Sequence, residues 1–434
     1  MDLETSDTTA SPAGSASAGD GDILSCSLSD PDILARPLEF YEALRARSPV
    51  HYDEKLGKYL VARFDDIWTV LRDPVLYSAG HGFHDIYGDE NQRELIEILK
   101  RDGGGHFPDA IMSDPPYHTK IRKLMEKAFT AHRVKTLEPG ITRVVSEIID
   151  RFADRGEAEG INDFAIPLTI AIICEQLGLR NYDPDKIRRW SVAVTAQISH
   201  MQTREEFLDN ARAMCDLQNF LIDEIRQRQK EPREDMISDL VFAKIDEDGT
   251  ELTWEELVSL VRATLVGGHD TTSIALGKML FILSTRPDIA AELRDHLDDE
   301  RLFMRFVEEL LRHQSPVRGL PRTVMEDTEL NGVRLAKGSL LILLWASANV
   351  DAFERPREFD MERPNLQRHL AFGGGTHRCI GMALARMELK VAAREFVRRL
   401  DDIRLTIPAD EVPFNQTVSM HSIAQLPLTF SRRQ

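Results

Sequence analysis

Apolar residues along most of this chain recur every three or four positions, which is the spacing of helices that bury one face. The longest predicted helix opens with a capping box, Thr253-Trp-Glu-Glu256, and stops before Pro287. Helix is expected to follow helix between Tyr117 and Gln229. The individual helices are predicted over residues 37–47, 92–100, 185–199, 204–229, 252–284, 303–313 and 380–400.

Shorter stretches carry the patterns of strands. Residues 50–61 predict a hairpin, and residues 329–335 predict another that turns at Asn331-Gly332. Residues 340–348 are almost continuously apolar and predict a buried strand, and residues 405–430 predict further short strands. The fold class expected from these elements is mainly α with small β-sheets (α+β).

Three segments lack a regular apolar pattern. Residues 1–22 hold almost no large apolar side chains and are expected to form a disordered N-terminal tail. Residues 77–107 predict a loop region around one helix, and residues 351–365, which contain two prolines, predict irregular structure. No repeat or composition shift divides residues 23–434, so one large domain is expected there.

Composition argues against several classes of function. The net charge of -18 over 434 residues disfavours nucleic-acid binding and attachment to anionic membranes. Without a run of about 20 apolar residues, no membrane span is expected. The four cysteines (Cys26, Cys174, Cys215 and Cys379) are scattered, which argues against a disulfide framework or a zinc module. A soluble, cytoplasmic monomer is the expectation.

One cysteine lies in a distinctive sequence, Phe372-Gly-Gly-Gly-Thr-His-Arg-Cys-Ile-Gly381. Consecutive glycines let the backbone approach a flat ligand closely. Cys379 falls where this loop enters a helix, and the N–H groups of a helix start favour a thiolate. A thiolate in such a place can bind haem iron. The alternative is a core cysteine beside a glycine turn.

A second motif, Gly267-Gly-His-Asp-Thr-Thr272, interrupts the longest apolar helix. Glycine and a helix-bonding hydroxyl allow local opening toward a ligand. An acid beside a threonine offers a path for protons to bound oxygen. Taken alone, the motif fits a glycine-kinked core helix equally well.

Two further motifs are weak when taken singly. Glu309 and Arg312 share a helical face and can pair, as many solvated helices also show. His118 and Arg122 also share a face and could clamp a carboxylate, although a solvated basic face is the simpler explanation.

These four motifs, in this order, resemble the cytochrome P450 family from about Ile23 onward. The cysteine loop matches the family pattern Phe-Gly-x-Gly-x-His-x-Cys-x-Gly at every fixed position. The resemblance implies one large triangular domain with an α-rich and a β-rich part, of the soluble bacterial class. The sequence departs from the family at Asn349-Val350-Asp351, where Asn-Arg-Asp is frequent.

The resemblance also implies a role for each matching residue. Cys379 would be the metal ligand of haem b (iron protoporphyrin IX). Asp270 and Thr271 would be catalytic and deliver protons to dioxygen. Glu309, Arg312 and Arg363 would form a structural triad. The residues that would bind the cofactor are His118, Arg122, Arg322, Phe372, Gly373, His377, Cys379 and Gly381.

The implied reaction inserts one oxygen atom of dioxygen into a lipophilic small molecule, such as a terpenoid, steroid, fatty acid or aromatic. Arg318 and His421 are further candidates to meet a polar group of the substrate. The residues expected around the substrate are Phe83, Ile86, Leu265, Val266, Gly267, Val317, Leu320, Met420 and Ile423.

Electrons would have to come from outside, because no flavin segment or iron–sulfur cysteine set is apparent. A ferredoxin and its reductase are the expected donors, docking on a basic patch of Lys120, Lys123, Lys127 and Arg378. Three alternatives stay open: a peroxide-driven peroxygenase, a haem-binding sensor or carrier without turnover, and a structural helical protein. The retained Asp270 and Thr271 favour dioxygen over peroxide.

Overall fold

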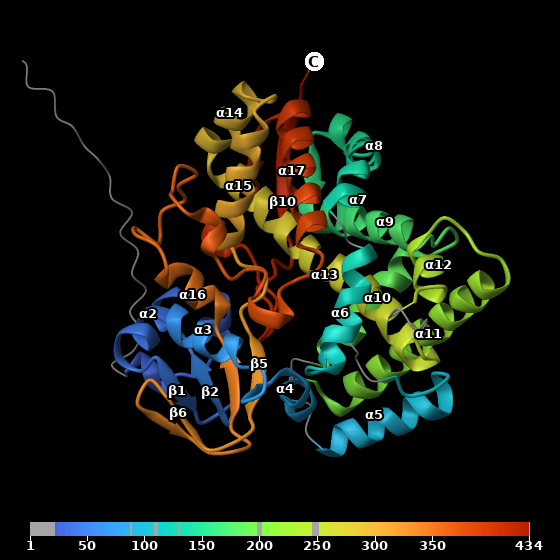
Figure 1. The fold of residues 1–434 in the computed structure, drawn as a ribbon. Coiled ribbons are helices and arrows are strands. Elements are labelled where there is room, and N and C mark those ends of the chain that lie inside the picture. The colour runs from blue at the N-terminus through green and yellow to red at the C-terminus, as the bar shows by residue number, and fades with distance from the viewer. Residues whose placement is uncertain are drawn as a thin grey trace, which may run out of the picture.

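The computed structural model of the chain describes residues 22–86, 89–107, 112–128, 131–197, 202–244 and 251–433. A helix-rich part and a smaller sheet-rich part lie side by side, and the long helix α13 (Trp254–Thr285) runs through the middle of the molecule (Figure 1). Its N-cap Thr253 and Glu256 form the predicted capping box. The predicted tail lies outside the described residues except for Asp22.

Helices follow one another closely between residues 117 and 230, as the apolar spacing predicts. The other α-helices are α1 (Pro31–Ala35), α2 (Leu38–Arg47), α3 (Phe64–Arg72), α4 (Ala79–Ile86), α5 (Asp89–Asp102), α6 (Tyr117–Ala128), α7 (Ala131–Thr136), α8 (Glu138–Asp150), α9 (Ile166–Leu177), α10 (Pro184–Ala196), α11 (Arg204–Lys230), α12 (Met236–Val241), α14 (Pro287–Asp295), α15 (Glu300–His313), α16 (Trp345–Asp351) and α17 (Met382–Arg399).

Within the described residues the strands form a five-stranded sheet in the order β1-β2-β8-β5-β3, a three-stranded sheet β4-β10-β9, and the hairpin β6-β7. Both predicted hairpins are confirmed, since β1 pairs with β2 and β6 with β7, each antiparallel. The strands are β1 (Val50–Asp53), β2 (Lys58–Val61), β3 (Tyr77–Ser78), β4 (Glu157–Glu159), β5 (Leu320–Val324), β6 (Thr328–Leu330), β7 (Val333–Leu335), β8 (Leu340–Leu343), β9 (Leu400–Leu405) and β10 (Pro427–Arg432).

Two predicted elements differ from the structure. The strand expected over residues 340–348 ends at Leu343, where its pairing with the last residue of β2 and the first residue of β5 stops, and α16 begins at Trp345. The loop region 77–107 contains α4 as well as the expected helix. The carboxylate of Asp114 accepts the backbone N–H groups of Ala79 and Gly80, so a residue far along the chain caps α4.

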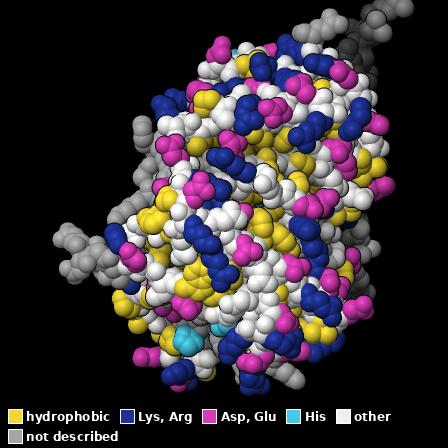
Figure 2. All heavy atoms as spheres, turned by 90° about the vertical axis from the view of Figure 1, so that its right-hand side faces the viewer, with side chains coloured by type: hydrophobic (Ala, Val, Ile, Leu, Met, Phe, Trp, Pro, Cys, Tyr) yellow, Lys and Arg dark blue, Asp and Glu magenta, His cyan; other side chains and the backbone are white. Residues whose placement is uncertain are grey.

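One segment, Gly160–Leu177, is long and apolar enough to cross a membrane by length and composition. Most of it is buried, and its helix α9 packs against α13 in the centre of the molecule. These contacts are those of a core helix. On the face shown in Figure 2, basic and acidic side chains are interspersed, and neither sign gathers into one field.

Candidate active site

The cysteine loop is shaped by glycines at positions where a side chain would be strained. Gly373 and Gly375 have φ angles of 64° and 63°, the left-handed region that side chains disfavour. A Cβ on Gly375 would lie 2.3 Å from the carbonyl oxygen of Leu71 in α3. The loop therefore lies directly against the sheet-rich part, and Cys379 follows in the turn that leads into α17.

Cys379 opens into a central cavity and not onto the outer surface, which explains why its side chain is accessible although protein surrounds it. Burial raises the pKa of Cys379. The backbone N–H groups of Gly381 and Met382 lower this pKa, and so do the cations Arg122 and Arg386. The N–H groups of the helix start thus favour the thiolate, as expected, but burial outweighs them in the protein alone. A bound metal would supply the missing stabilisation, because coordination deprotonates a thiol.

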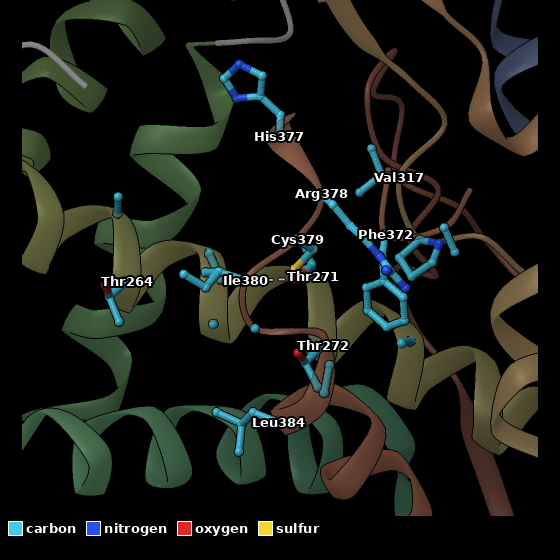
Figure 3. A pocket seen from close by; sticks show the side chains of 18 of the residues that line it. Thr264, Thr271, Thr272, Val317, Phe372, His377, Arg378, Cys379, Ile380 and Leu384 are labelled. Atoms are coloured by element: carbon cyan, nitrogen blue, oxygen red, sulfur yellow. Dashed lines mark hydrogen bonds between the residues drawn. The ribbon is translucent and has the colours of Figure 1, made fainter. Parts of the chain in front are cut away.

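The cavity measures about 330 Å³ and lies between the cysteine loop and α13. Figure 3 shows Cys379 and Phe372 from the loop and Thr264, Thr271 and Thr272 from α13 around this space. Most other residues in its wall are apolar, among them Ile121, Met125, Ile173, Ala263, Ala275, Leu311, Val317, Leu320, Leu384 and Leu389.

The two glycines of the α13 motif have different roles. A Cβ on Gly268 would lie 2.6 Å from Cδ1 of Ile173, so this glycine lets α9 approach α13. Gly267 faces the cavity, where a Cβ would meet nothing within 4 Å. The hydroxyl of Thr271 donates to the carbonyl of Gly267 at 3.0 Å, inside the same cavity.

Asp270 lies outside the cavity wall and turns toward α10, where it bonds with Thr195. Burial raises the pKa of Asp270 to about 6. The residues Asp270 and Thr271 are adjacent in sequence, but they point to different sides of α13. The structure therefore does not bring their side chains together.

The motif around His118 lies at one edge of the cavity. His118 and Arg122 of α6 line it together with His377, and the rings of His118 and His377 are 4.0 Å apart. Arg122 donates to the carbonyl of Arg378. Arg322 of β5 is buried but is not part of the cavity wall; it donates to the carbonyl of Pro321, and burial lowers its pKa to about 10.

This edge of the cavity has the right chemistry for the carboxylates of a haem. Within the described residues, the buried Nδ1 of His118 and the indole N–H of Trp345 have no hydrogen-bond partner. Both residues line the cavity. Buried polar groups are rarely left unpaired in native proteins, so these nitrogens indicate a missing polar ligand. A flat group with acidic edges and a metal facing Cys379 would fit.

Glu309, Arg312 and Arg363 lie together behind the loop and are completely or almost completely buried. Arg312 donates to Glu309 through Nε at 2.6 Å and Nη2 at 2.7 Å, and Nε of Arg363 is 3.5 Å from the same carboxylate. Arg312 also donates to the carbonyls of Pro356 and Glu358. The three charges hold the irregular segment 351–365 in place.

Some residues predicted around the substrate are not in the cavity wall. Gly267, Val317 and Leu320 line the cavity, but Leu265 and Val266 pack in the core between α9, α11 and α13. The cavity-facing positions of α13 are 263, 264, 267, 268, 271, 272 and 275, which is one helical stripe, and residues 265 and 266 fall outside it.

The C-terminal segment also differs from the expectation. Ile423 belongs to the core, and Met420 pairs with Val317 without lining the cavity. Arg318 and His421 do not meet the cavity either. Arg318 donates to the carbonyl of Met420, and His421 lies 2.7 Å from the amine of Lys278. The side chains of Phe83 and Ile86 lie outside the described residues.

One acid in the cavity wall is not among the predicted site residues. Glu388 of α17 is buried, lines the cavity, and has an Oε2 atom without a partner in the described part of the chain. Burial raises its pKa well above the ordinary value, which favours the protonated form of the acid. Its position four residues after Leu384, which also lines the cavity, was the available signal.

The fold and the site define a protein that holds a flat prosthetic group between a cysteine loop and a central helix. The family model described as Cytochrome P450 matches residues 179–427. The chain belongs to the cytochrome P450 family, has the fold of that family, and is a haem-dependent monooxygenase.

Three similar proteins illustrate the relationship. Cytochrome P450 107B1 of Saccharopolyspora erythraea is 33% identical over 86% of this chain and 89% of its own length. Steroid C26-monooxygenase of Mycobacterium tuberculosis is 33% identical over 83% of this chain and 97% of its own. The solved structure of CYP109Q5 from Chondromyces apiculatus is 30% identical, with a TM-score of 0.82 over 95% of this chain and 100% of its own.

Proposed function

We propose that the protein hydroxylates a lipophilic small molecule with dioxygen, using haem b bound through Cys379 and electrons from a ferredoxin and its reductase. One observation supports this most directly: Cys379 of the cysteine loop and Thr271 of α13 line the same largely apolar cavity. When bound, a haem with a thiolate ligand supplies oxygen activation. Such an enzyme would be a cytoplasmic monomer.

The haem carboxylates would lie at the edge of the cavity formed by His118, Arg122 and His377. Arg122 adds a cation and Trp345 an unpaired N–H. Arg322, buried nearby in β5, would approach the same edge after a side-chain rotation. Gly373 and Gly381 would let the backbone pass close to the ring, and Phe372 would pack beside the cysteine.

Protons would reach the cavity through Thr271. Its hydroxyl lies one turn along α13 from Gly267, the position where a Cβ would meet nothing within 4 Å. Asp270 would supply this hydroxyl after leaving Thr195, because its pKa of about 6 lets it both hold and release a proton near neutral pH. Retention of these two residues favours dioxygen over peroxide.

The substrate would be lipophilic because the cavity wall is largely apolar. A steroid is a sensible first test, since the similar enzyme of Mycobacterium tuberculosis is named for a steroid substrate. Terpenoids, fatty acids and aromatics complete the panel. Binding is measured as a low- to high-spin shift of the Soret band, and a panel that gives no shift argues against this class of substrate.

The electron donor would dock beside Lys120, Lys123 and Arg378, which lie on α6 and on the cysteine loop. Lys123 is exposed, Arg378 is exposed and also lines the cavity, and the side chain of Lys127 lies outside the described residues. Lys123→Glu should slow reduction by a ferredoxin at low ionic strength, because charge steers association. An unchanged rate would contradict this docking site.

The deciding experiment is spectroscopic. Protein produced with ample iron and porphyrin, then reduced and exposed to carbon monoxide, should show the long-wavelength Soret band of thiolate coordination. Cys379→Ser should abolish this band, whereas Cys174→Ser, in the core, should keep it. Absence of the band in the unmodified protein, or its persistence in Cys379→Ser, would reject the proposal.

A further inference from the structure

A buried ion pair lies directly behind Phe372. The guanidinium carbon of Arg386, on α17, is 4.6 Å from the centroid of the Phe372 ring. The same guanidinium is held by Glu308 of α15 through two contacts, Nε to Oε1 at 2.5 Å and Nη2 to Oε2 at 3.0 Å. Arg386 is 15% exposed and Glu308 only 4%, so solvent screens the pair poorly.

His369 fixes the other side of the carboxylate. Its Nε2 is 3.1 Å from Oε2 of Glu308, and its Nδ1 accepts the backbone N–H of Ala371 at 3.2 Å. Because Nδ1 is an acceptor, the ring proton is on Nε2 and is donated to Glu308. His369 lies three residues before Phe372, so the carboxylate is tied to the start of the cysteine loop and cannot follow Arg386 if that side chain moves.

The contacts place the cation of Arg386 against Phe372 of the cysteine loop, and its counter-ion Glu308 on the neighbouring helix α15. The Phe372 ring contacts the guanidinium, and the carbonyl of Phe372 accepts the N–H of Cys379 at 2.9 Å. In a site of low dielectric constant, a fixed charge beside the loop that carries the metal ligand acts strongly on a metal centre whose two oxidation states differ by one charge.

We infer that Arg386 and Glu308 are positioning residues that set the reduction potential of the haem, through the guanidinium that Glu308 holds against Phe372. This inference rests on the proposed function, because it requires a haem bound through Cys379. Neither residue touches the cavity-facing reactants; they act through Phe372 and the cysteine loop.

The pair predicts shifts of opposite sign. Arg386→Gln removes a positive charge, which favours the more positive ferric state, so the potential should become more negative. Glu308→Gln keeps the guanidinium but removes its counter-ion, so the potential should become more positive. The double variant removes one charge of each sign and should lie between the two. A merely structural role would shift both single variants in the same direction.

The same two helices offer a matched control. Arg394 of α17 pairs with Glu300 of α15 and lies 5.1 Å from the ring of Phe303, which repeats the arrangement two helical turns farther from the loop. At about 1.5 Å per residue, these eight positions amount to roughly 12 Å, beyond a Debye length at physiological salt. Arg394→Gln and Glu300→Gln should leave the potential unchanged.

The experiment is a spectroelectrochemical titration of the ferric–ferrous couple in the haem-loaded full chain. Opposite shifts for Arg386→Gln and Glu308→Gln, with no shift in the two controls, would support the inference. Shifts of equal sign, or no shift, would overturn it. The ferrous carbon monoxide spectrum of each variant distinguishes failure of this inference from failure of the proposed function. A retained long-wavelength band with unshifted potentials rejects only this inference. Loss of that band in the unmodified protein rejects the proposed function.

Discussion

Two buried polar regions of this molecule differ in how completely their groups are paired. Behind the cysteine loop, Glu309 and Arg312 bond to each other, and Arg312 also bonds to carbonyls of the irregular segment. At the cavity, Glu388, His118 and Trp345 each carry a buried atom without a partner in the described residues. The paired region maintains the structure, and in the unpaired region a bound ligand would supply the missing partners.

The largest effect should come from breaking the paired region. Arg312→Leu would leave Glu309 fully buried without its partner, which typically costs about 3–5 kcal/mol. Urea unfolding should show a correspondingly lower midpoint. As a control, Arg143→Leu breaks a pair with Glu147 that is about half exposed and should cost at most about 1 kcal/mol. Equal losses in both variants would contradict the comparison.

Glycines give a second contrast. Gly375→Ala would force a Cβ to within 2.3 Å of the Leu71 carbonyl at a φ of 63°, so a loss of about 1–3 kcal/mol is expected, together with weaker haem binding. Gly267→Ala meets nothing within 4 Å and lies in a helix, so it should stabilise the protein by about 0.5–1 kcal/mol. Thermal unfolding of the two variants measures the difference, which should have opposite signs.

The unpaired acid predicts a pH dependence. Burial raises the pKa of Glu388 above its ordinary value of 4.5, so the folded protein keeps a proton that the unfolded chain releases. This contribution to stability is complete below pH 4.5 and is lost as the pH rises toward the folded pKa. Glu388→Gln should remove that loss and flatten the profile of unfolding free energy against pH. An unchanged slope between pH 5 and 8 would show that Glu388 is ionised in the fold.

Asp270 should also make the protein less stable as the pH rises, but over a narrower pH range. Its pKa is raised by burial from 3.8 to about 6, so its contribution is present below pH 3.8 and is lost by about pH 6. Asp270→Asn should flatten the stability profile in this interval only. Unfolding by urea at a series of pH values measures both acids, and a change above pH 7 would assign the effect to another group.

The smallest effect concerns the indole of Trp345. Trp345→Phe would remove the hydrogen bond that we propose between the indole N–H and a bound haem, a loss of about 0.5–1.5 kcal/mol, so haem should leave about two- to tenfold faster. Transfer of haem to apomyoglobin measures this rate. Trp190→Phe changes a buried tryptophan of α10 that does not line the cavity and should leave the rate unchanged. Equal rates in both variants would show that the indole N–H bonds to water instead.

Local patterns predicted much of the fold. Both hairpins, the capping box of α13 and the turn before α17 follow from short-range spacing and turn chemistry. Elements that depend on remote contacts were missed, such as α4, whose cap is Asp114. The strand predicted over 340–348 was too long because its apolar run continues into α16. A buried strand and a buried helix can both give a continuous apolar run in the sequence.

The site was harder to predict than the fold. The cysteine loop could be recognised because its glycines and cysteine are adjacent in sequence. The rotation of α13 could not, since that helix is buried on most of its sides, and Leu265 and Val266, predicted at the cavity, lie in the core. The direction of Asp270 depends on Thr195 in another helix, and the unpaired state of Glu388 depends on every neighbour around it.

The contact between Gly375 and Leu71 has a mechanical consequence. The turn that carries the metal ligand is braced against a helix of the sheet-rich part, while α17 behind it belongs to the helix-rich part. The ligand is thus fastened to both halves of the molecule. Local unfolding of either half should therefore change the environment of the haem iron before the whole chain unfolds. The absorption spectrum of the haem should then detect partial unfolding anywhere along the contact between the two halves.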